Sequence, residues 1–564
     1  MKKHQLHPKI EFTNTRELLK YAAKTYGEKT AISYRETPHQ KESTKVSYTQ
    51  FENDVASLAS RLLSMGCEGK HCVLIGKTSY EWILTYYATL SIGAVLIPLD
   101  RDWLKEDLLD TVKTANANFL FGDADIKEKI EFIAENTSLE AVPVYLGSKD
   151  DATTVFSLVD EGRVEFKAHP DRYYSTPIDP TGMSLLVFTS GTTGKGKGVM
   201  LSQNAILADM YNVVHYIDFA NKSISVLPPH HTYGSTVMFI GHMMIGSEIY
   251  LSSGIRYITK ELKDEAPGHL ILVPLYLETF YRKICATLKD QGKFKLVFRM
   301  MKVSNFLRKI GIDLRKKFFK AIHAVFGGNV KMIITGGAPI NPDILYFYDS
   351  IGINILNGYG ITECAPLVAV NRSKNNVLGT VGNPIDFVFV KIDEPNEDGE
   401  GEILVKGQNV MLGYYNNRQA TAEAFKDGYF RTGDYGKISK RGTIAITGRK
   451  KNLIILSNGK NVYPEEIENE LIATPGLVDI IVYEGQSKRG LEHNAIVAEI
   501  YPDKEFFEKA EITDINAYFK PFIDDFNKRT VSYKKIAVVK IRDEEFPKNT
   551  LRKIQRFKLD MTID

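Results

Sequence analysis

Short apolar runs alternate with longer segments of helical spacing over the N-terminal part of the chain, to about residue 260. Four of these runs, CVLIG, AVLIPLD, NFLFGD and VPVYLG, end on a glycine or an aspartate, and helical patterns such as SYTQFENDVASLASRLLSMG lie among them. Such alternation is typical of a largely parallel sheet with helices packed on both faces. Residues 328–363 repeat the order of strand, glycine turn, helix and strand. We therefore predict an α/β fold with more than one sheet.

The length of the chain and a change of pattern predict two domains. A chain of 564 residues exceeds what one hydrophobic core usually organises. Residues 401–415 and 435–464 are rich in β-branched residues and turns, which suits a small β-barrel-like subdomain. The α/β alternation returns at residue 467. We place the boundary in the polar basic turn GRKKN, which predicts a large N-terminal domain of residues 1–448 and a smaller α+β domain of residues 449–564.

The composition gives no general argument for nucleic-acid binding, because the net charge is only +3. Four cysteines show neither a C-x-x-C pair nor zinc spacing, and no cleavable signal is expected, so the predicted location is the cytoplasm. The most apolar stretch, residues 82–100, is interrupted by Thr85, Ser91, Gly93 and Pro98. This stretch predicts a buried helix followed by a strand rather than a membrane span.

The segment LLVFTSGTTGKGKGVML, residues 185–201, has the composition of a phosphate-binding loop. Gly191 to Lys197 fits the first seven places of the P-loop pattern, but Gly198 stands where that pattern needs a hydroxyl. The residues after the loop resemble a second strand, and a helix begins only after Ser202, which we expect to be its N-cap. Glycines, hydroxyls, Lys195 and Lys197 favour a strand–loop–strand unit that binds an anion. A solvated turn and a P-loop kinase or NTPase are the alternatives.

Residues 281–320 carry thirteen Lys or Arg against two Asp, interleaved with apolar residues at helical spacing. A basic amphipathic surface of this kind suits a membrane interface with anionic lipid, or a polyanionic ligand. The alternative is a helical excursion whose charges are simply solvated. The predicted location therefore includes peripheral contact with the inner face of the membrane as one option.

Seven motifs occur in an order that is far more specific than any one of them. They are FTSGTTGKGKGVML, LPPHHTYGS, TGGAP, NGYGITE, YFRTGD, GRKKNLIILSNGKNVYPEEIE and FPKNTLRKIQR. This series resembles that of the adenylate-forming superfamily of acyl-CoA synthetases, firefly-type luciferases and peptide-synthetase adenylation domains, from about residue 15 to the C-terminus. The resemblance implies ATP as a substrate, with its β- and γ-phosphates in the first loop. The implied loop ligands are Thr189, Ser190, Gly191, Thr192, Thr193, Gly194 and Lys197.

The same resemblance implies roles that the side chains could fill physically. Tyr359 offers a flat surface for adenine, Thr362 a hydroxyl for the α-phosphate or the acyl oxygen, and Glu363 a hard oxygen ligand for Mg²⁺. Asp434 would accept hydrogen bonds from the ribose hydroxyls, with help from Arg449. The remaining residues implied beside the nucleotide are Gly336, Gly337, Ala338, Pro339 and Gly360.

The acyl and coenzyme A sites are implied by further motifs. His231, Tyr233 and Gly234 would line the acyl pocket, and we reject a zinc site at His230 and His231 because no partner ligands stand at supportive spacing. The resemblance further implies that the C-terminal domain rotates about a hinge at Lys451. This rotation would move Lys553, which serves adenylation, out of the site and bring in Gly459, which lies along the coenzyme A channel.

Three departures from the family pattern stand beside a feature shared with long-chain enzymes. Gly196 replaces the usual proline, SQNA lacks the common histidine, and Arg552 stands where glycine is common. The long-chain acyl-CoA synthetases carry an extended helical insertion before GGAP, and residues 281–320 are similar in placement. The resemblance therefore favours a fatty acid as the substrate.

The predicted reaction is activation of a medium- or long-chain fatty acid by ATP to its CoA thioester, with release of AMP and pyrophosphate. The predicted cofactors are ATP, Mg²⁺ and coenzyme A as co-substrate. An acyl-acyl-carrier-protein synthetase or a stand-alone adenylation enzyme, with a carrier-protein acceptor, is the main alternative. A non-catalytic lipid-binding homologue is a further alternative. The acyl chain length and the oligomeric state do not follow from the motifs.

Overall fold

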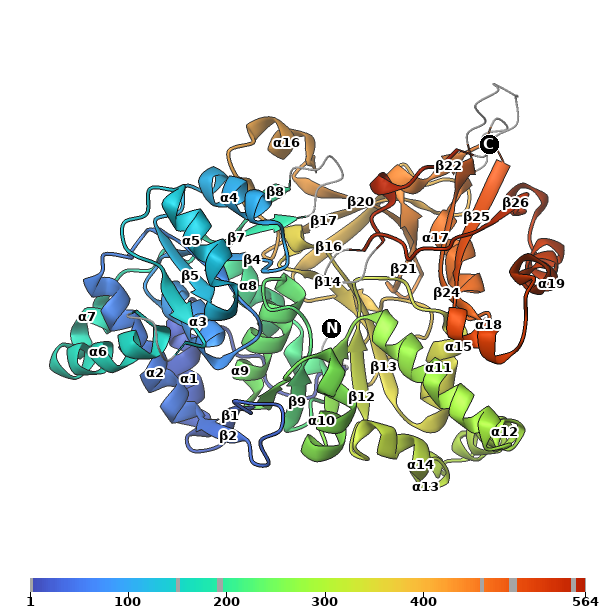
Figure 1. Cartoon of the computed structure of the whole chain (residues 1–564), viewed down its shortest axis with the longest axis horizontal. Coiled ribbons are helices and arrows are strands. Elements are labelled where there is room, and N and C mark those ends of the chain that lie inside the picture. The colour runs from blue at the N-terminus through green and yellow to red at the C-terminus, as the bar shows by residue number, and fades with distance from the viewer. Residues whose placement is uncertain are drawn as a thin grey trace.

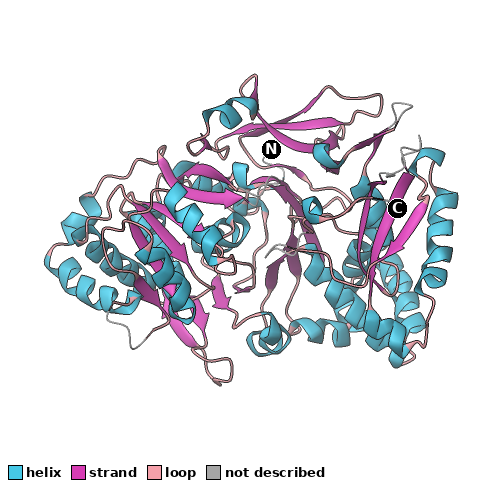
Figure 2. Ribbon diagram, turned by 45° about the horizontal axis from the view of Figure 1, so that its top comes forward, coloured by secondary structure: helices cyan, strands magenta, loops and turns pink. Residues whose placement is uncertain are grey.

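The computed structural model describes residues 4–148, 153–189, 196–456, 461–485, 495–548 and 554–562. Figure 1 shows layered sheets and helices over most of the molecule, with the C-terminal strands and helices at the right of the view. The predicted α/β fold class is confirmed, because mixed sheets carry helices on both faces (Figure 2).

The first sheet has seven strands in the order β18-β8-β7-β4-β3-β5-β6. Strands β4, β3, β5 and β6 are parallel, as the alternating pattern predicted, and β7 pairs parallel with β4. The strands are β3 (His71–Ile75), β4 (Val95–Leu99), β5 (Phe119–Asp123), β6 (Val144–Leu146), β7 (Met183–Thr189), β8 (Lys197–Ser202) and β18 (Gly413–Tyr414).

Helices cover both faces of this sheet. One face packs on α4 (Lys105–Thr114) and α5 (Lys127–Glu135), through residues such as Leu108 and Ile130. The other face packs on α2 (Tyr48–Ser64), α3 (Tyr80–Ser91) and α6 (Val155–Ala168). A sheet buried in this way needs strands that are apolar on both sides, which explains why the runs in the sequence are continuous rather than alternating.

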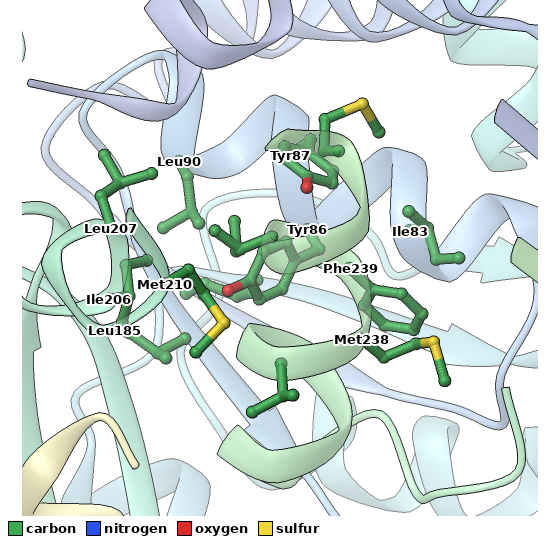
Figure 3. Packing of buried hydrophobic residues seen from close by; sticks show 14 of the residues in the cluster. Ile83, Tyr86, Tyr87, Leu90, Leu185, Ile206, Leu207, Met210, Met238 and Phe239 are labelled. Atoms are coloured by element: carbon green, nitrogen blue, oxygen red, sulfur yellow. The ribbon is translucent and has the colours of Figure 1, made fainter. Parts of the chain in front are cut away.

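The largest core lies under α3 and a π-helix, η4 (Tyr233–Ile240). Figure 3 shows Tyr86 and Tyr87 of α3 packed near Phe239 and Met238 of η4, with Leu207 and Met210 of α8 (Gln203–Tyr211) beside them. All residues of α3 are buried and β4 follows it, which confirms the prediction of a buried helix and a strand for residues 82–100. Within the described residues, every helix is too short or too polar to span a membrane.

Two further sheets form the second α/β part of the chain. One has the order β2-β1-β10-β9 and the other β11-β12-β13-β14-β15. Their strands are β1 (Thr30–Tyr34), β2 (Thr44–Ser47), β9 (Lys222–Ser225), β10 (Glu248–Leu251), β11 (His269–Leu272), β12 (Met332–Thr335), β13 (Asn354–Gly360), β14 (Leu367–Val370) and β15 (Asn383–Pro384). Strand β13 is parallel to β12 and antiparallel to β14, so it ends where two sheet directions meet.

The basic segment is helical, as predicted, and lies between β11 and β12. Its helices are α11 (Pro274–Asp290), α12 (Phe294–Lys309), α13 (Arg315–Phe318) and α14 (Lys320–His323). They pack on α15 (Pro342–Ile351) through a second hydrophobic cluster that includes Phe280, Met301 and Phe319.

The predicted β-rich subdomain is an antiparallel sheet of β16 (Val388–Asp393), β17 (Gly401–Gly407), β19 (Phe425–Lys426), β20 (Tyr429–Ile438) and β21 (Ile444–Arg449). The C-terminal part has its own sheet and core. Its sheet is β24 (Leu477–Gly485), β25 (Ala495–Pro502) and β26 (Val538–Ile541), packed with α17 (Pro464–Leu471), α18 (Lys504–Lys509) and α19 (Ile515–Arg529). The division at residues 448 and 449 stays a prediction.

Candidate nucleotide and acyl site

The predicted phosphate loop connects two antiparallel strands. β7 and β8 pair with Thr189 opposite Lys197. The Ser202 side chain accepts a hydrogen bond from the Ala205 backbone N–H, and so caps α8 as expected. A strand therefore follows Lys197 where a P-loop would begin its helix, which agrees with the strand–loop–strand interpretation. Ser190, Gly191, Thr192, Thr193, Gly194 and Lys195 lie outside the described residues.

Lys197 is linked to Glu363 through Tyr414, a residue that the sequence analysis missed. The Lys197 ammonium lies 4.7 Å from the centre of the Tyr414 ring, and the Tyr414 hydroxyl donates a hydrogen bond to Glu363 Oε1 at 2.9 Å. Pairing of β18 with β8, Tyr414 opposite Val199, brings the ring to this place. Burial and the Glu363 carboxylate raise the pKa of Tyr414, so its hydroxyl stays a donor at neutral pH. Nothing in the motifs distinguishes Tyr414 from an ordinary strand residue.

Glu363 lies on a single 3₁₀ turn, η7 (Thr362–Cys364), directly after β13. Its backbone carbonyl accepts from the Met411 N–H at 2.8 Å, which ties the turn to the segment just before β18. The Glu363 side chain is half-buried. Asn409 links the turn to the buried Asp209, because its amide donates to the Cys364 carbonyl at 3.0 Å and to Asp209 at 3.1 Å. Asp209 also accepts from the Leu367 N–H, just after the turn, at 3.0 Å.

The side chains around Glu363 suit Mg²⁺ better than they suit a metal ion whose ligands all come from the protein. Among the described residues no group of three or more His, Cys, Asp or Glu side chains could hold a metal ion. Mg²⁺ is commonly bound by one or two carboxylates together with substrate phosphates and water. The half-buried Glu363, linked through Tyr414 to Lys197 at the start of β8, satisfies that requirement.

Tyr359, Asp434 and Arg449 form one cluster. The Tyr359 hydroxyl donates to Asp434 Oδ2 at 2.7 Å, and Arg449 Nε lies 3.0 Å from Asp434 Oδ1. The last two residues face one another in the β20–β21 register. The Asp434 carboxylate raises the pKa of Arg449, and burial followed by Asp434 raises that of Tyr359. The sequence analysis assigned Tyr359 to the adenine and Asp434, with help from Arg449, to the ribose. It did not predict that Tyr359 would also orient Asp434.

The TGGAP segment leaves β12 and approaches the end of β13 closely. A Cβ added to Gly336 would lie 2.9 Å from the Gly358 carbonyl oxygen, so a larger residue would displace one of the two backbone segments. Gly336 is buried, whereas Gly337, Ala338 and Pro339 are exposed. The exposed backbone therefore lies at the end of the strand that carries Tyr359 and Gly360.

The LPPHHTYGS segment turns into η4, a π-helix beside the core. Tyr233 donates from its hydroxyl to the Leu272 carbonyl at 3.2 Å, at the end of β11. His230 Nε2 lies 3.7 Å from Asp100, yet burial lowers the pKa of His230 below its ordinary value. The ring centres of His230 and His231 are 6.0 Å apart.

Gly234 has no room for a side chain. A Cβ at this position would lie 2.1 Å from the Pro228 carbonyl oxygen. We expect Gly234→Ala to lower the free energy of unfolding by about 1–3 kcal/mol, because the backbone must move to admit the methyl group. Urea unfolding measures the change. Gly241→Ala is the control, since its added Cβ would meet the adaptable Met210 sulfur at 3.2 Å. An equal loss in the two variants would contradict this explanation.

The predicted hinge region follows β21. Residues 450–452 form a 3₁₀ turn, η8 (Lys450–Asn452), and the Lys450 ammonium pairs with Glu402 at 2.8 Å. Burial, with a smaller contribution from Arg449, lowers the pKa of Lys451. Gly459, Arg552 and Lys553 lie outside the described residues.

Contacts with α11 and with the residue before α15 join the segment after the hinge to the rest of the chain. Arg282 of α11 donates to the Leu477 carbonyl at 3.0 Å, and the Asn341 side chain donates to the Asn469 carbonyl at 2.6 Å.

A protein-family model described as AMP-binding enzyme matches residues 19–415. The chain belongs to this family. Long-chain-fatty-acid–CoA ligase FadD15 of Mycobacterium tuberculosis is 28% identical over 472 residues, covering 79% of this chain and 76% of the relative. Long-chain-fatty-acid–CoA ligase 5 of Rattus norvegicus is 28% identical over 499 residues, covering 82% and 71%. The probable acyl-activating enzyme 16, chloroplastic, of Arabidopsis thaliana is 28% identical over 600 residues, covering 93% and 81%.

Solved structures share the fold across almost the whole chain. ATP-bound MatB from Rhodopseudomonas palustris has a TM-score of 0.74 at 23% identity, covering 96% of this chain and 97% of that one. The anthranilate CoA ligase AuaEII, in complex with anthranoyl-AMP, has a TM-score of 0.75 at 17% identity, covering 98% and 97%. The family and its relatives confirm the prediction of an adenylate-forming enzyme of the acid–thiol ligase class.

Proposed function

We propose that this AMP-binding enzyme joins a medium- or long-chain fatty acid to coenzyme A through an acyl-adenylate, with ATP as the source of the adenylyl group. The observation that supports this proposal most strongly is the placement of two clusters by one short segment. Tyr359 at the end of β13 belongs to the cluster with Asp434, and Glu363 four residues later belongs to the cluster with Tyr414 and Lys197. One ATP molecule could use the first cluster for its nucleoside and the second for its phosphates.

In the first half-reaction the acid's carboxylate attacks the α-phosphorus of ATP. The bond from that phosphorus to the oxygen bridging to the β-phosphate breaks, and pyrophosphate leaves. Such a displacement asks the protein for position and charge rather than covalent chemistry. Lys197 would neutralise phosphate charge, and Thr362 would donate its hydroxyl to the α-phosphate or to the acyl oxygen. Asp434 would hold the ribose hydroxyls. Glu363 would hold a Mg²⁺ ion, which would supply positive charge to the phosphates.

In the second half-reaction the thiolate of coenzyme A attacks the acyl carbon, and AMP leaves with the bridging oxygen. We infer that the C-terminal domain turns about Lys451 between the two steps, as the resemblance implies. Turning would carry Lys553 away from the acyl-adenylate and bring Gly459 towards the thiol. The short polar turn η8 supports a hinge at this place, because few apolar contacts need to break there.

Two observations favour a fatty acid. The relatives from M. tuberculosis and R. norvegicus are named long-chain-fatty-acid–CoA ligases. The proposed acyl wall at Tyr233 and Gly234 leads into η4, whose residues 235–240 are buried and largely apolar. Fatty acids partition into membranes, so contact of residues 281–320 with a membrane surface remains part of the proposal. An acyl carrier protein in place of coenzyme A is the second candidate acceptor.

Pyrophosphate release across a panel of carboxylic acids tests the proposal. The panel runs from acetate to long-chain acids, with coenzyme A and separately with a phosphopantetheinylated carrier protein. We expect release with medium- or long-chain acids and a CoA thioester as the product. Thioester formation only on the carrier protein would show that the carrier protein, rather than coenzyme A, is the acceptor. Formation of ADP would rule out adenylate chemistry.

A further inference from the structure

The outer face of α12 is unlike an ordinary solvated helix. Four large apolar side chains on it are exposed: Leu296 at 56%, Val303 at 55%, Phe306 at 64% and Ile310 at 61%. Leu296, Val303 and Ile310 are each seven residues apart, which is close to two helical turns, and Phe306 lies between the last two. They therefore form one stripe along the helix, which we call the apolar stripe.

A row of cations runs beside the apolar stripe. Lys295, Lys302 and Lys309 also follow one another at intervals of seven, and each is exposed. Arg299 lies within the stripe itself and is exposed as well. The helix thus presents apolar groups and positive charges together on the same outer side, which is the composition of an interfacial helix.

The opposite side of α12 is fixed to the protein. Met301 and Ser304 are buried, and Arg308 donates to both oxygens of Asp349 on α15 at 2.9 and 2.8 Å. Asn305 donates to the Ser350 hydroxyl at 2.8 Å. These contacts set the rotation of the helix, so the apolar stripe cannot turn inward. Figure 1 shows α12 at the periphery of the molecule, near α13 and α14.

The neighbouring short helices extend the positive surface. Lys316, Lys317 and Lys320 line a hollow of about 500 Å³ together with Asp313 and His323. A hollow rimmed by lysines has the charge and the size to receive an anionic headgroup.

We propose that the apolar stripe and its lysine row form a docking surface for an anionic lipid membrane. Charge decides between the occupants: a second copy of this chain would bring two lysine rows together, whereas acidic lipid headgroups complement them. The exposed Phe306, Val303 and Ile310 would enter the boundary between headgroups and acyl chains, a contact that a nucleic acid does not offer. The proposal rests on the proposed function in one respect, which is that the surface would give the enzyme access to a fatty acid dissolved in the membrane.

Vesicle co-sedimentation of the full-length protein tests the surface directly. The probes are vesicles of phosphatidylcholine alone and of phosphatidylcholine with phosphatidylserine. We expect binding only to the anionic vesicles, and we expect 1 M salt to abolish most of it, because the screening length falls from about 8 Å to about 3 Å. Equal binding to both vesicle types, or binding to duplex DNA as strong as to anionic vesicles, would overturn the proposal. Dimerisation of the wild-type chain that Phe306→Ser abolishes would assign the stripe to a second copy instead.

Paired variants separate the two parts of the surface. Lys302→Glu with Lys309→Glu should weaken binding roughly 25-fold or more, at about fivefold for each lysine. Phe306→Ser with Ile310→Ser should weaken it by at least tenfold, because each removes a large apolar group that the membrane would bury. The matched controls are Lys440→Glu with Lys504→Glu and the exposed Phe389→Ser, which should leave binding within about twofold. No effect of the apolar-stripe and lysine-row variants would overturn the proposal.

Pyrophosphate release with the acid dispersed in detergent keeps the two proposals distinguishable. We expect the surface variants to retain it, since none of their residues lies in the nucleotide site. Lost vesicle binding with intact release would support the docking surface, and wild-type vesicle binding without any release would count against the proposed function alone.

Discussion

Lys553→Ala should lower acyl-adenylate formation by roughly 10²- to 10³-fold while leaving the conversion of supplied acyl-adenylate to acyl-CoA nearly intact. The resemblance assigns the Lys553 ammonium to the carboxylate and the α-phosphate, where charge is redistributed during adenylation. Thioester formation would take place after the domain has turned, with Lys553 away from the site. Pyrophosphate release from ATP measures the first step, and acyl-CoA formation from synthetic acyl-adenylate measures the second.

Gly459→Leu is the reciprocal variant and serves as the matched control. A leucine side chain would obstruct a narrow channel for the thiol, whereas the adenylating arrangement does not use this residue. Gly459→Leu should therefore retain the first step and lose the second. Equal loss of both steps in both variants would contradict the alternation of domains, because it would indicate a single shared site or a folding defect.

Glu363→Gln should make adenylation slow, by roughly 10²-fold or more at limiting Mg²⁺, and should raise the Mg²⁺ concentration needed for half-maximal rate. The amide keeps the shape of the carboxylate and can still accept from the Tyr414 hydroxyl, now 2.9 Å from Glu363. Only the charge that holds the cation is lost. A titration of the pyrophosphate-release rate against Mg²⁺ provides the measurement.

Tyr414→Phe separates the charge of Glu363 from its orientation. The phenyl ring preserves the surface under the Lys197 ammonium, which lies 4.7 Å from the ring centre, but the donor to Glu363 is lost. We expect a smaller decrease in rate than for Glu363→Gln, with the Mg²⁺ requirement shifted in the same direction. Unchanged Mg²⁺ dependence in Glu363→Gln would show that Glu363 does not hold the metal ion.

The sequence predicted the parts of the fold that depend on local pattern. Continuous apolar runs predicted the parallel strands β3, β4 and β5, and the residues after Lys197 predicted a strand in place of a P-loop helix. Ser202 was predicted as a helix cap from its hydroxyl and its place before an apolar helix, and its side chain accepts from Ala205. Each of these outcomes is determined by residues close together in the chain.

The sequence analysis did not predict the contacts between segments that are distant along the chain. Tyr414 reaches Glu363 only because β18 adds to the edge of the seven-stranded sheet beside β8. Tyr359 was predicted as a ring for adenine, but its hydroxyl bond to Asp434 depends on how β13 lies against β20. Asp209 stabilises the turn that carries Glu363 from a helix more than a hundred and fifty residues earlier in the chain. The motif order brought these regions into one site, but pairing and packing decide which atoms meet.

The central claim, that the acid's own carboxylate attacks the α-phosphorus of ATP, can be tested with one isotope measurement. A fatty acid labelled with oxygen-18 in its carboxylate is incubated with the enzyme, ATP, Mg²⁺ and coenzyme A, and the AMP is analysed by mass spectrometry. Attack by the carboxylate followed by thiolysis of the acyl-adenylate predicts AMP carrying a single oxygen-18 atom, with the other retained in the thioester. Unlabelled AMP, or ADP as the nucleotide product, would contradict the account.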